Sequence, residues 1–312
     1  MKVLVYHRDA KTYYRMLQER FPELEVVALE EKGLRPQHIA EADILIANHF
    51  PSVLFKEAKR LRWIQSSSAG IDRLLGVREC PGEVVVTNAR GIHAHLMADY
   101  VFCAVTMFQW NFPRIFRDQQ HREWHHIAVR PLAGMTLGVV GLGTIGTEIA
   151  RRARTFGMNV VGVKRTSAPV EGVDQVFGPD RLGEMLSLCD FVVLVVPATA
   201  QTERMFGASE FQAMKRTAYL VNISRGSTVD EEALIQALQQ GSIAGAILDV
   251  FDKEPLPAES PLWFLENVVI TPHIAGYLHG YTQQVMEIFS DNLTRWRKGL
   301  PLRNVVDLER GY

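Results

Sequence analysis

The sequence lacks the features that mark secreted, membrane-spanning and disulfide-rich proteins. Its 312 residues include only three cysteines, Cys80, Cys103 and Cys189, which are widely spaced and form no CxxC pair. An odd number of isolated thiols is typical of a reducing compartment. No apolar run has the length of a membrane span without charges or glycines, and the run in MKVLVYHRD is too short for a signal peptide. We therefore expect a cytoplasmic protein with no membrane partner.

An excess of charge of one sign is also absent. The 34 lysines and arginines are balanced by 35 aspartates and glutamates, which gives a formal net charge of -1. A chain without net positive charge has no bulk attraction to nucleic acid, so we expect no nucleic-acid partner. What remains is an ordinary globular composition, 47% hydrophobic and 22% charged, in a chain long enough for two domains.

Short apolar runs alternate with amphipathic segments along the chain. Strands that alternate with helices form parallel sheets covered on both faces, so the sequence predicts an α/β protein with two doubly wound parallel-sheet domains. The expected strands of the first domain are 3–6, 25–29, 44–47, 63–66 and 84–87. Those of the second domain are 136–140, 159–163, 191–196, 218–223, 244–248 and 268–271.

Two long amphipathic segments, 93–110 and 280–299, each lead from one expected domain towards the other. The final stretch LPLRNVVD reads as a return to the first domain. We therefore predict a discontinuous first domain, residues 1–97 and 276–312, with residues 98–275 inserted as the second.

The stretch TLGVVGLGTIGTEIARRARTFG reads as strand, turn and helix. Gly141 allows the tight turn, Gly143 lets the backbone approach a pyrophosphate, and Gly146 lets helix and strand pack closely. A helix that begins at Thr144 directs its free amides at the phosphates. A glycine-rich turn without a ligand is the alternative, but the flanking strands favour a dinucleotide site.

The next expected strand ends in KRTS, where a dinucleotide-binding unit commonly has an acidic residue for the ribose hydroxyls. Arg165 favours a 2′-phosphate instead, because a guanidinium pairs bidentately with phosphate. Lys164 adds positive charge, and Thr166 offers a hydroxyl donor. The stretch predicts NADPH/NADP as the preferred cofactor, with NADH/NAD as the other cofactor and a solvated basic loop as the alternative interpretation.

Polar residues follow three later strands of the second domain. Arg225 follows the first, Asp249 and Glu254 the second, and His273 the third. The carboxyl ends of parallel strands share one edge, where ligands bind. An arginine can hold a substrate carboxylate and polarise a ketone, and a histidine can supply a proton as a hydride arrives. A carboxylate orients the imidazole and favours its protonated form.

Other histidines are given no catalytic role. His121 and His125 stand four residues apart, a spacing that allows a metal site on a helix, but no cysteine or evident acidic cluster completes it. We expect no metal and a surface role for them. His93 and His95 would point away from each other on a helix.

Several motifs in order, SSSAGIDRL, GLGTIG, VPATAQT, NISRG, LDVFDKEP and TPHIAG, resemble the D-isomer-specific 2-hydroxyacid dehydrogenase family over nearly the whole chain. The resemblance implies a flavodoxin-like substrate domain, an inserted Rossmann nucleotide-binding domain, and a homodimer built largely through the nucleotide domains. It implies Arg225 as the substrate anchor, His273 as the acid/base and Glu254 as the partner of His273.

The resemblance also implies further binding residues. Asp249 would hold the nicotinamide amide. The substrate would contact Ser68, Ala69, Gly70, Arg225 and His273, and the cofactor would contact Thr144, Ile145, Pro197, Thr202 and Ile223.

Among family members, KRTS and PLWFLENVVITPH look most like the glyoxylate/hydroxypyruvate reductases. We therefore expect NADPH-dependent reduction of a small 2-keto acid to the D-2-hydroxy acid. Tyr277 departs from the small residue that many relatives have at this position, which leaves a bulkier 2-keto acid as an alternative. Trp124 is a candidate for approaching the site from a neighbouring subunit. A non-enzymatic dinucleotide sensor, like the corepressors of the family, is the other alternative.

Overall fold

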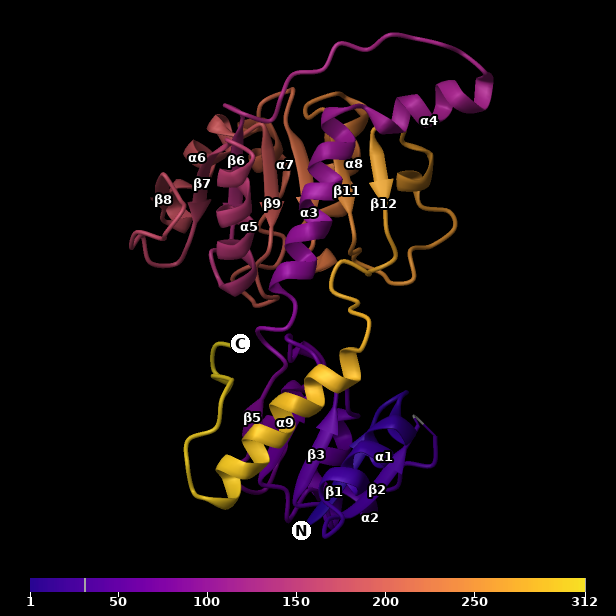
Figure 1. Cartoon of the computed structure of the whole chain (residues 1–312), viewed down its shortest axis with the longest axis vertical. Helices are drawn as coiled ribbons and strands as arrows, with labels where there is room; N and C mark the ends of the chain where they lie inside the picture. Colours follow the sequence, from indigo (N-terminus) through magenta and orange to yellow (C-terminus); the bar gives the residue numbers. More distant parts are fainter. Residues whose placement is uncertain (31, 312) are drawn as a thin grey trace. The chain divides into compact units, whose positions relative to one another are not determined.

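The computed structural model describes residues 1–30 and 32–311, which form two compact units (Figure 1). Unit 1 comprises Met1–Ile92 and Leu278–Tyr312, and unit 2 comprises His93–Tyr277. The boundaries expected from the sequence lie a few residues inside unit 2. Position 98 falls within one continuous helix, α3 (Ala94–Gln109), which belongs to unit 2 from its first residue. The assignment of a substrate domain and a nucleotide domain stays a prediction.

Unit 1 is built on a five-stranded parallel sheet in the order β2-β1-β3-β4-β5. This is the flavodoxin-like order of a doubly wound sheet. Val3 of β1 pairs with Val26 of β2 on one side and with Ile44 of β3 on the other. The strands are β1 (Lys2–Tyr6), β2 (Glu25–Leu29), β3 (Ile44–Ala47), β4 (Trp63–Ser66) and β5 (Val85–Thr87).

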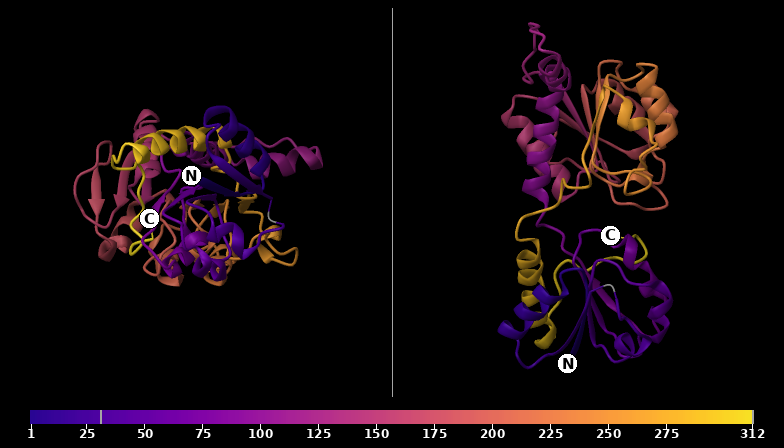
Figure 2. Two further views of the ribbon diagram at one scale, coloured as in Figure 1. Left: turned by 90° about the horizontal axis from the view of Figure 1, so that it is seen from below. Right: turned by 90° about the vertical axis from the view of Figure 1, so that its right-hand side faces the viewer.

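Helices cover both faces of the unit 1 sheet (Figure 2). One face packs against α1 (Ala10–Arg20) and α9 (Tyr281–Arg297). The other packs against the short elements α2 (Pro36–Ala40), η1 (Ser52–Glu57) and η2 (Asp72–Glu79). Because both faces are buried, a strand such as β3 reads as an unbroken apolar run, ILIA.

Unit 2 contains a seven-stranded parallel sheet in the order β12-β11-β10-β9-β6-β7-β8. Counted from its first strand this is the Rossmann order, with a crossover between β6 and β9. The fold class expected from the sequence is confirmed in both units. The strands are β6 (Thr136–Val140), β7 (Asn159–Val163), β8 (Gln175–Phe177), β9 (Phe191–Leu194), β10 (Tyr219–Asn222), β11 (Gly245–Leu248) and β12 (Val268–Ile270).

Two hydrophobic cores lie on the two faces of this sheet. Val139 faces α3 and α5 (Thr144–Thr155), and its neighbour Val140 faces the other core. The second core contains α6 (Leu182–Leu188), α7 (Ala208–Ala213) and α8 (Glu231–Gln239). The remaining elements are α4 (Phe112–His121), η3 (Pro179–Arg181), η4 (Gly226–Thr228) and η5 (Pro261–Phe264). Among the helices of residues 1–30 and 32–311, none combines the length and apolar composition needed to cross a bilayer.

Trp63 fixes the C-terminal helix α9 to the sheet of unit 1. Its side chain is fully buried and stacks on Phe289, with ring centroids 5.0 Å apart, and on Trp296 at 5.8 Å. The indole Nε1 donates a hydrogen bond to Thr87 Oγ1 at 2.9 Å. These contacts explain why a segment more than two hundred residues away in the sequence completes the N-terminal unit.

We predict that Trp63→Ala lowers the free energy of unfolding by about 3–5 kcal/mol, the cost of truncating a buried aromatic side chain. Urea denaturation followed by far-ultraviolet circular dichroism measures it. Phe264→Ala is the control, because Phe264 is 78% exposed. Its substitution should change the free energy of unfolding by less than about 0.5 kcal/mol. Equal stability of the two variants would contradict the assigned role of Trp63.

Candidate active site

Three neighbouring strands of unit 2 end at the candidate catalytic residues. β10, β11 and β12 are adjacent and parallel. Arg225 lies shortly after β10, Asp249 directly follows β11, Glu254 lies in the same loop as Asp249, and His273 follows β12. Because the carboxyl ends of parallel strands share an edge, the fold brings all four residues to one edge of the sheet.

His273 and Glu254 form a hydrogen-bonded pair. The His273 Nδ1 lies 2.8 Å from Glu254 Oε2, so the ring donates from Nδ1 and keeps Nε2 for a second proton. The other carboxylate oxygen of Glu254 accepts from the Phe251 amide at 3.1 Å, which fixes the carboxylate within its own loop. The His273 side chain is 44% exposed. An oriented and accessible imidazole of this kind is suited to general acid/base chemistry.

The buried carboxylate of Asp249 holds the turn that contains His273. Its Oδ1 accepts from the Ile274 amide at 2.8 Å and from Thr271 Oγ1 at 2.6 Å. Its Oδ2 accepts from the Ala275 amide at 2.9 Å. His273 has a φ of 54°, in the left-handed region that few non-glycine residues adopt. The expected contact between Asp249 and a nicotinamide amide stays a prediction. Thr271, which also holds this turn, was not among the site residues expected from the sequence.

Arg225 directly precedes the short turn η4, and Gly226 lets that turn approach the Glu254 loop. The Arg225 Nη1 donates to the Ser224 carbonyl at 2.8 Å. A Cβ on Gly226 would overlap the backbone of Phe251 and Asp252, so the two loops touch through a position that has no room for a side chain. The glycine therefore sets how closely the arginine loop approaches the loop of Glu254.

His93 is a buried neighbour of this arrangement, at the start of α3. Burial and, to a smaller extent, the positive charge of Arg225 together lower the pKa of His93 to about 4. His93 is therefore neutral near pH 7. His95 points elsewhere, because its side chain is 79% exposed and lies 3.1 Å from Glu148. The two histidines thus lie on different sides of the helix, as expected.

The glycine turn has the geometry that a pyrophosphate site needs. Gly141 has a φ of 108°, and a Cβ there would lie 2.6 Å from the Val195 carbonyl oxygen. A Cβ on Gly146 would overlap the Gly141 carbonyl. Nothing lies within 4 Å of a Cβ position on Gly143, so the backbone there faces open space. α5 begins directly after it, with Thr144 exposed and Ile145 partly buried. The amides of this first turn are therefore available to an anion.

The stretch expected to select the cofactor lies directly after β7. The Lys164 amide donates to the Phe177 carbonyl at 3.1 Å, which continues the pairing of β7 with β8 by one residue. Lys164 is partly buried, and Arg165 and Thr166 are exposed. The cations therefore stand at the end of the strand next to the glycine turn, as expected, since β6 and β7 are neighbours in the sheet.

The expected lining of the cofactor site follows β9 and β10. Thr202 Oγ1 donates to the Pro197 carbonyl at 2.6 Å and accepts from the Thr199 amide at 2.9 Å. These bonds close the loop after β9 into a fixed turn. Ile223 is buried at the end of β10, and its amide donates to the Leu194 carbonyl at 3.2 Å.

Ser68, Ala69 and Gly70 belong to unit 1, where they follow β4. The Ser68 hydroxyl donates to the Gly70 carbonyl at 2.6 Å, and Asn88 Nδ2 donates to the Ala69 carbonyl at 2.7 Å. Within residues 1–30 and 32–311, no hydrogen bond uses the amides of Ala69 and Gly70. The carbonyls of this turn are therefore held by hydrogen bonds, and the expected contact of its amides with a substrate carboxylate stays a prediction.

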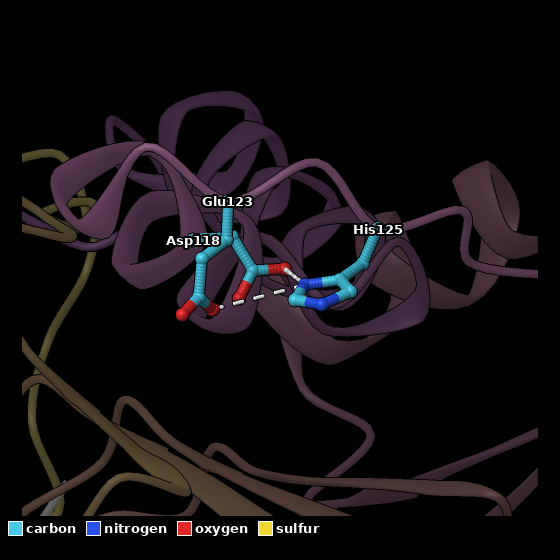
Figure 3. Close-up of side chains that lie close together, drawn as sticks. All are labelled: Asp118, Glu123 and His125. Atoms are coloured by element: carbon cyan, nitrogen blue, oxygen red, sulfur yellow. Dashed lines mark hydrogen bonds and ion pairs between the residues drawn. The ribbon is translucent and has the colours of Figure 1, made fainter.

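A cluster of Asp118, Glu123 and His125 lies at the end of α4 and on the segment after it (Figure 3). His125 Nδ1 is 3.2 Å from Asp118 and 3.9 Å from Glu123, and Arg114 is 3.7 Å from Asp118. His121, the other member of the spacing noted in the sequence, bonds instead to the Arg117 carbonyl. This segment leads into β6, at the amino-terminal edge of the sheet, so the cluster lies away from the edge that carries Arg225 and His273.

The chain is similar to known proteins over most of its length. The family model described as "D-isomer specific 2-hydroxyacid dehydrogenase, NAD binding domain" matches residues 102–275. A glyoxylate reductase from Korarchaeum cryptofilum (strain OPF8) is 36% identical over 276 residues, which cover 85% of this chain and 82% of the relative.

Two solved structures are similar over the whole chain. A D-isomer specific 2-hydroxyacid dehydrogenase from Xanthobacter autotrophicus Py2, in complex with NADPH and MES, has a TM-score of 0.89 and 31% identity, with 99% of each chain covered. An NADPH-dependent glyoxylate/hydroxypyruvate reductase from Sinorhizobium meliloti, in complex with NADP and sulfate, has a TM-score of 0.90 and 25% identity, with 100% of each chain covered.

These matches confirm the resemblance noted in the sequence and the expected class of cofactor, a nicotinamide dinucleotide. The family model covers more than half of the chain, and the two solved structures share both of its parallel-sheet units. The chain belongs to the D-isomer-specific 2-hydroxyacid dehydrogenases, a family of NAD(P)-dependent oxidoreductases.

Proposed function

We propose that the chain reduces a small 2-keto acid of the glyoxylate or hydroxypyruvate type to the D-2-hydroxy acid, with NADPH as the hydride donor. The observation that carries the proposal is the His273–Glu254 pair, 2.8 Å apart, at the strand ends that also present Arg225. The similar proteins described as glyoxylate reductase and glyoxylate/hydroxypyruvate reductase support the substrate class.

Each residue of the trio has a distinct task in the proposed reaction. Arg225 binds the substrate carboxylate and polarises the ketone oxygen, since a guanidinium offers a planar pair of donors. His273 gives its Nε2 proton to that oxygen, and Glu254 accepts from Nδ1 and stabilises the imidazolium beforehand. When bound, the nicotinamide supplies the hydride to the carbonyl carbon.

The direct experiment incubates the purified chain with NADPH and glyoxylate or hydroxypyruvate and follows the near-ultraviolet absorbance of the reduced nicotinamide. We expect oxidation of NADPH in proportion to the D-hydroxy acid formed. Binding of NADPH without oxidation across a panel of 2-keto acids would favour the sensor instead. Faster turnover of large 2-keto acids would favour the bulkier substrate class, for which Tyr277 is the residue of interest.

We predict that His273→Ala lowers kcat by about a hundredfold or more, the usual contribution of a general acid. The affinity for NADPH, measured by fluorescence titration, should stay close to that of the unaltered protein. His126→Ala is the control, because this exposed histidine lies outside the site. Near-normal turnover of His273→Ala would refute the assignment.

We infer the preference for NADPH from the charge at the end of β7. Lys164 and Arg165 stand where dinucleotide sites commonly have a carboxylate that binds the ribose. Such a carboxylate would repel a 2′-phosphate, whereas the exposed Arg165 carries the opposite charge. The solved relatives in complex with NADPH and NADP are consistent with this preference.

We predict that Arg165→Ala raises KM for NADPH and leaves KM for NADH nearly unchanged. Charge-assisted hydrogen bonds contribute about 1.5–3 kcal/mol each, so KM for NADPH should rise roughly ten- to a hundredfold. Steady-state kinetics with both cofactors measures it. Arg181→Ala serves as the control, because Arg181 pairs with Glu184 on the surface of the same unit. An equal loss with both cofactors would show that Arg165 does not contact a 2′-phosphate.

We infer that the chain works as a homodimer, as the family resemblance implies. Large aromatic side chains are exposed along the segment around α4, namely Trp110, Phe112, Phe116 and Trp124, the last 87% exposed. Exposed aromatic groups in one segment are typical of an interaction surface. Light scattering should give twice the 35.2 kDa of one chain, and a monomeric mass at working concentration would contradict the inference.

A further inference from the structure

A chain of hydrogen bonds runs from helix α3 to the His273 turn. The Tyr100 hydroxyl lies 2.7 Å from Thr271 Oγ1, although 171 residues separate the two in the sequence. Thr271 Oγ1 lies 2.6 Å from Asp249 Oδ1. Asp249 in turn accepts from the amides of Ile274 and Ala275, the two residues that follow His273.

The chemistry of the three groups gives this chain one direction. A carboxylate accepts hydrogen bonds and donates none, so Thr271 must donate its single hydroxyl hydrogen to Asp249. The oxygen of Thr271 is then an acceptor towards Tyr100, and Tyr100 is the donor. Burial raises the pKa of Tyr100 well above its usual range, so the phenol keeps its proton at any working pH.

The turn at the end of this row of hydrogen bonds has an unfavourable backbone conformation. His273 is held in the left-handed region, with a φ of 54°, and its amide donates to the Thr271 carbonyl at 3.0 Å. A non-glycine residue keeps such a conformation only when its surroundings fix it. Asp249 fixes it through the amides on one side of His273 and through the Thr271 side chain on the other.

We propose that Tyr100 is a positioning residue for His273, because its hydroxyl orients Thr271, and Thr271 with Asp249 holds the imidazole where it delivers its proton. This assignment rests on the proposed function, since it gives His273 the role of proton donor. Hydrogen-bonded groups in a row polarise one another, so the first donor strengthens the bond that Thr271 makes to Asp249. Helix α3 thereby sets the geometry of the His273 turn, which is distant from it in the sequence.

The test is a double-mutant cycle on kcat with Tyr100→Phe and Thr271→Val, each of which removes one hydroxyl and little volume. Tyr100→Phe should lower kcat for the keto acid about two- to tenfold, the value of one neutral hydrogen bond, and should leave KM for NADPH within about twofold. In the Thr271→Val background, Tyr100→Phe should have no further effect on kcat, because the acceptor of its hydroxyl is already gone.

Tyr219→Phe is the matched control. Tyr219 is a partly buried tyrosine of the same unit, packed against Phe108 and Phe191, and its substitution should leave kcat unchanged. A merely structural role of Tyr100 would lower the melting temperature without changing kcat. Unchanged kcat in Tyr100→Phe, or independent effects of the two substitutions on kcat, would overturn the proposal.

A second measurement does not depend on turnover. Hydrogen–deuterium exchange of the peptide that contains Ile274 and Ala275 should be faster in Tyr100→Phe than in the unaltered protein or Tyr219→Phe, because the acceptor of both amides is held less firmly. If the unaltered protein reduced no keto acid, the proposed function would fail. Hydrogen–deuterium exchange would still test whether Tyr100 holds the turn. Faster exchange in Tyr100→Phe than in the unaltered protein would support this role, and equal exchange would overturn it.

Discussion

The buried carboxylate of Asp249 is the group on which the geometry of the site depends. It directly follows β11 and binds three donors from the segment after β12, so it joins two strand ends that the sheet alone would leave as separate loops. A buried carboxylate without donors would be costly, and the buried Ala275 amide without an acceptor would be costly too. Each therefore requires the other, and His273 is held between Thr271 and Ile274 as a result.

Close backbone packing gives the rest of the site its dimensions. Gly226 allows the Arg225 turn to touch the Phe251 loop, and Gly141 and Gly146 allow strand, turn and helix to meet at the expected phosphate site. In both places the missing side chain determines how near two backbones come. Arg225, His273 and the glycine turn thus lie at one edge of the sheet. They do so because parallel strands end at the same edge and because glycines let the loops that follow the strands approach one another.

Much of this could be predicted from the sequence, since strands buried on both faces read as apolar runs and polar residues that follow them mark one edge. The strand β8 (Gln175–Phe177) was missed because three residues with one exposed end give no such run. The pairing of His125 with Asp118 was missed because it depends on the left-handed Arg122, which turns the chain back after α4. No spacing rule could join Tyr100 to Thr271, because only the packing of α3 on the sheet brings them together.

The central claim is that Arg225, His273 and the glycine turn form one active site for a 2-keto acid. The most direct measurement is a crystal structure of the chain with NADP⁺ and oxamate, an unreactive analogue of a small keto acid. We expect the oxamate carboxylate against the Arg225 guanidinium and the oxamate amide oxygen within about 3.2 Å of His273 Nε2, the reach of a proton donor. Oxamate bound away from both side chains, with NADP⁺ on the glycine turn, would contradict it.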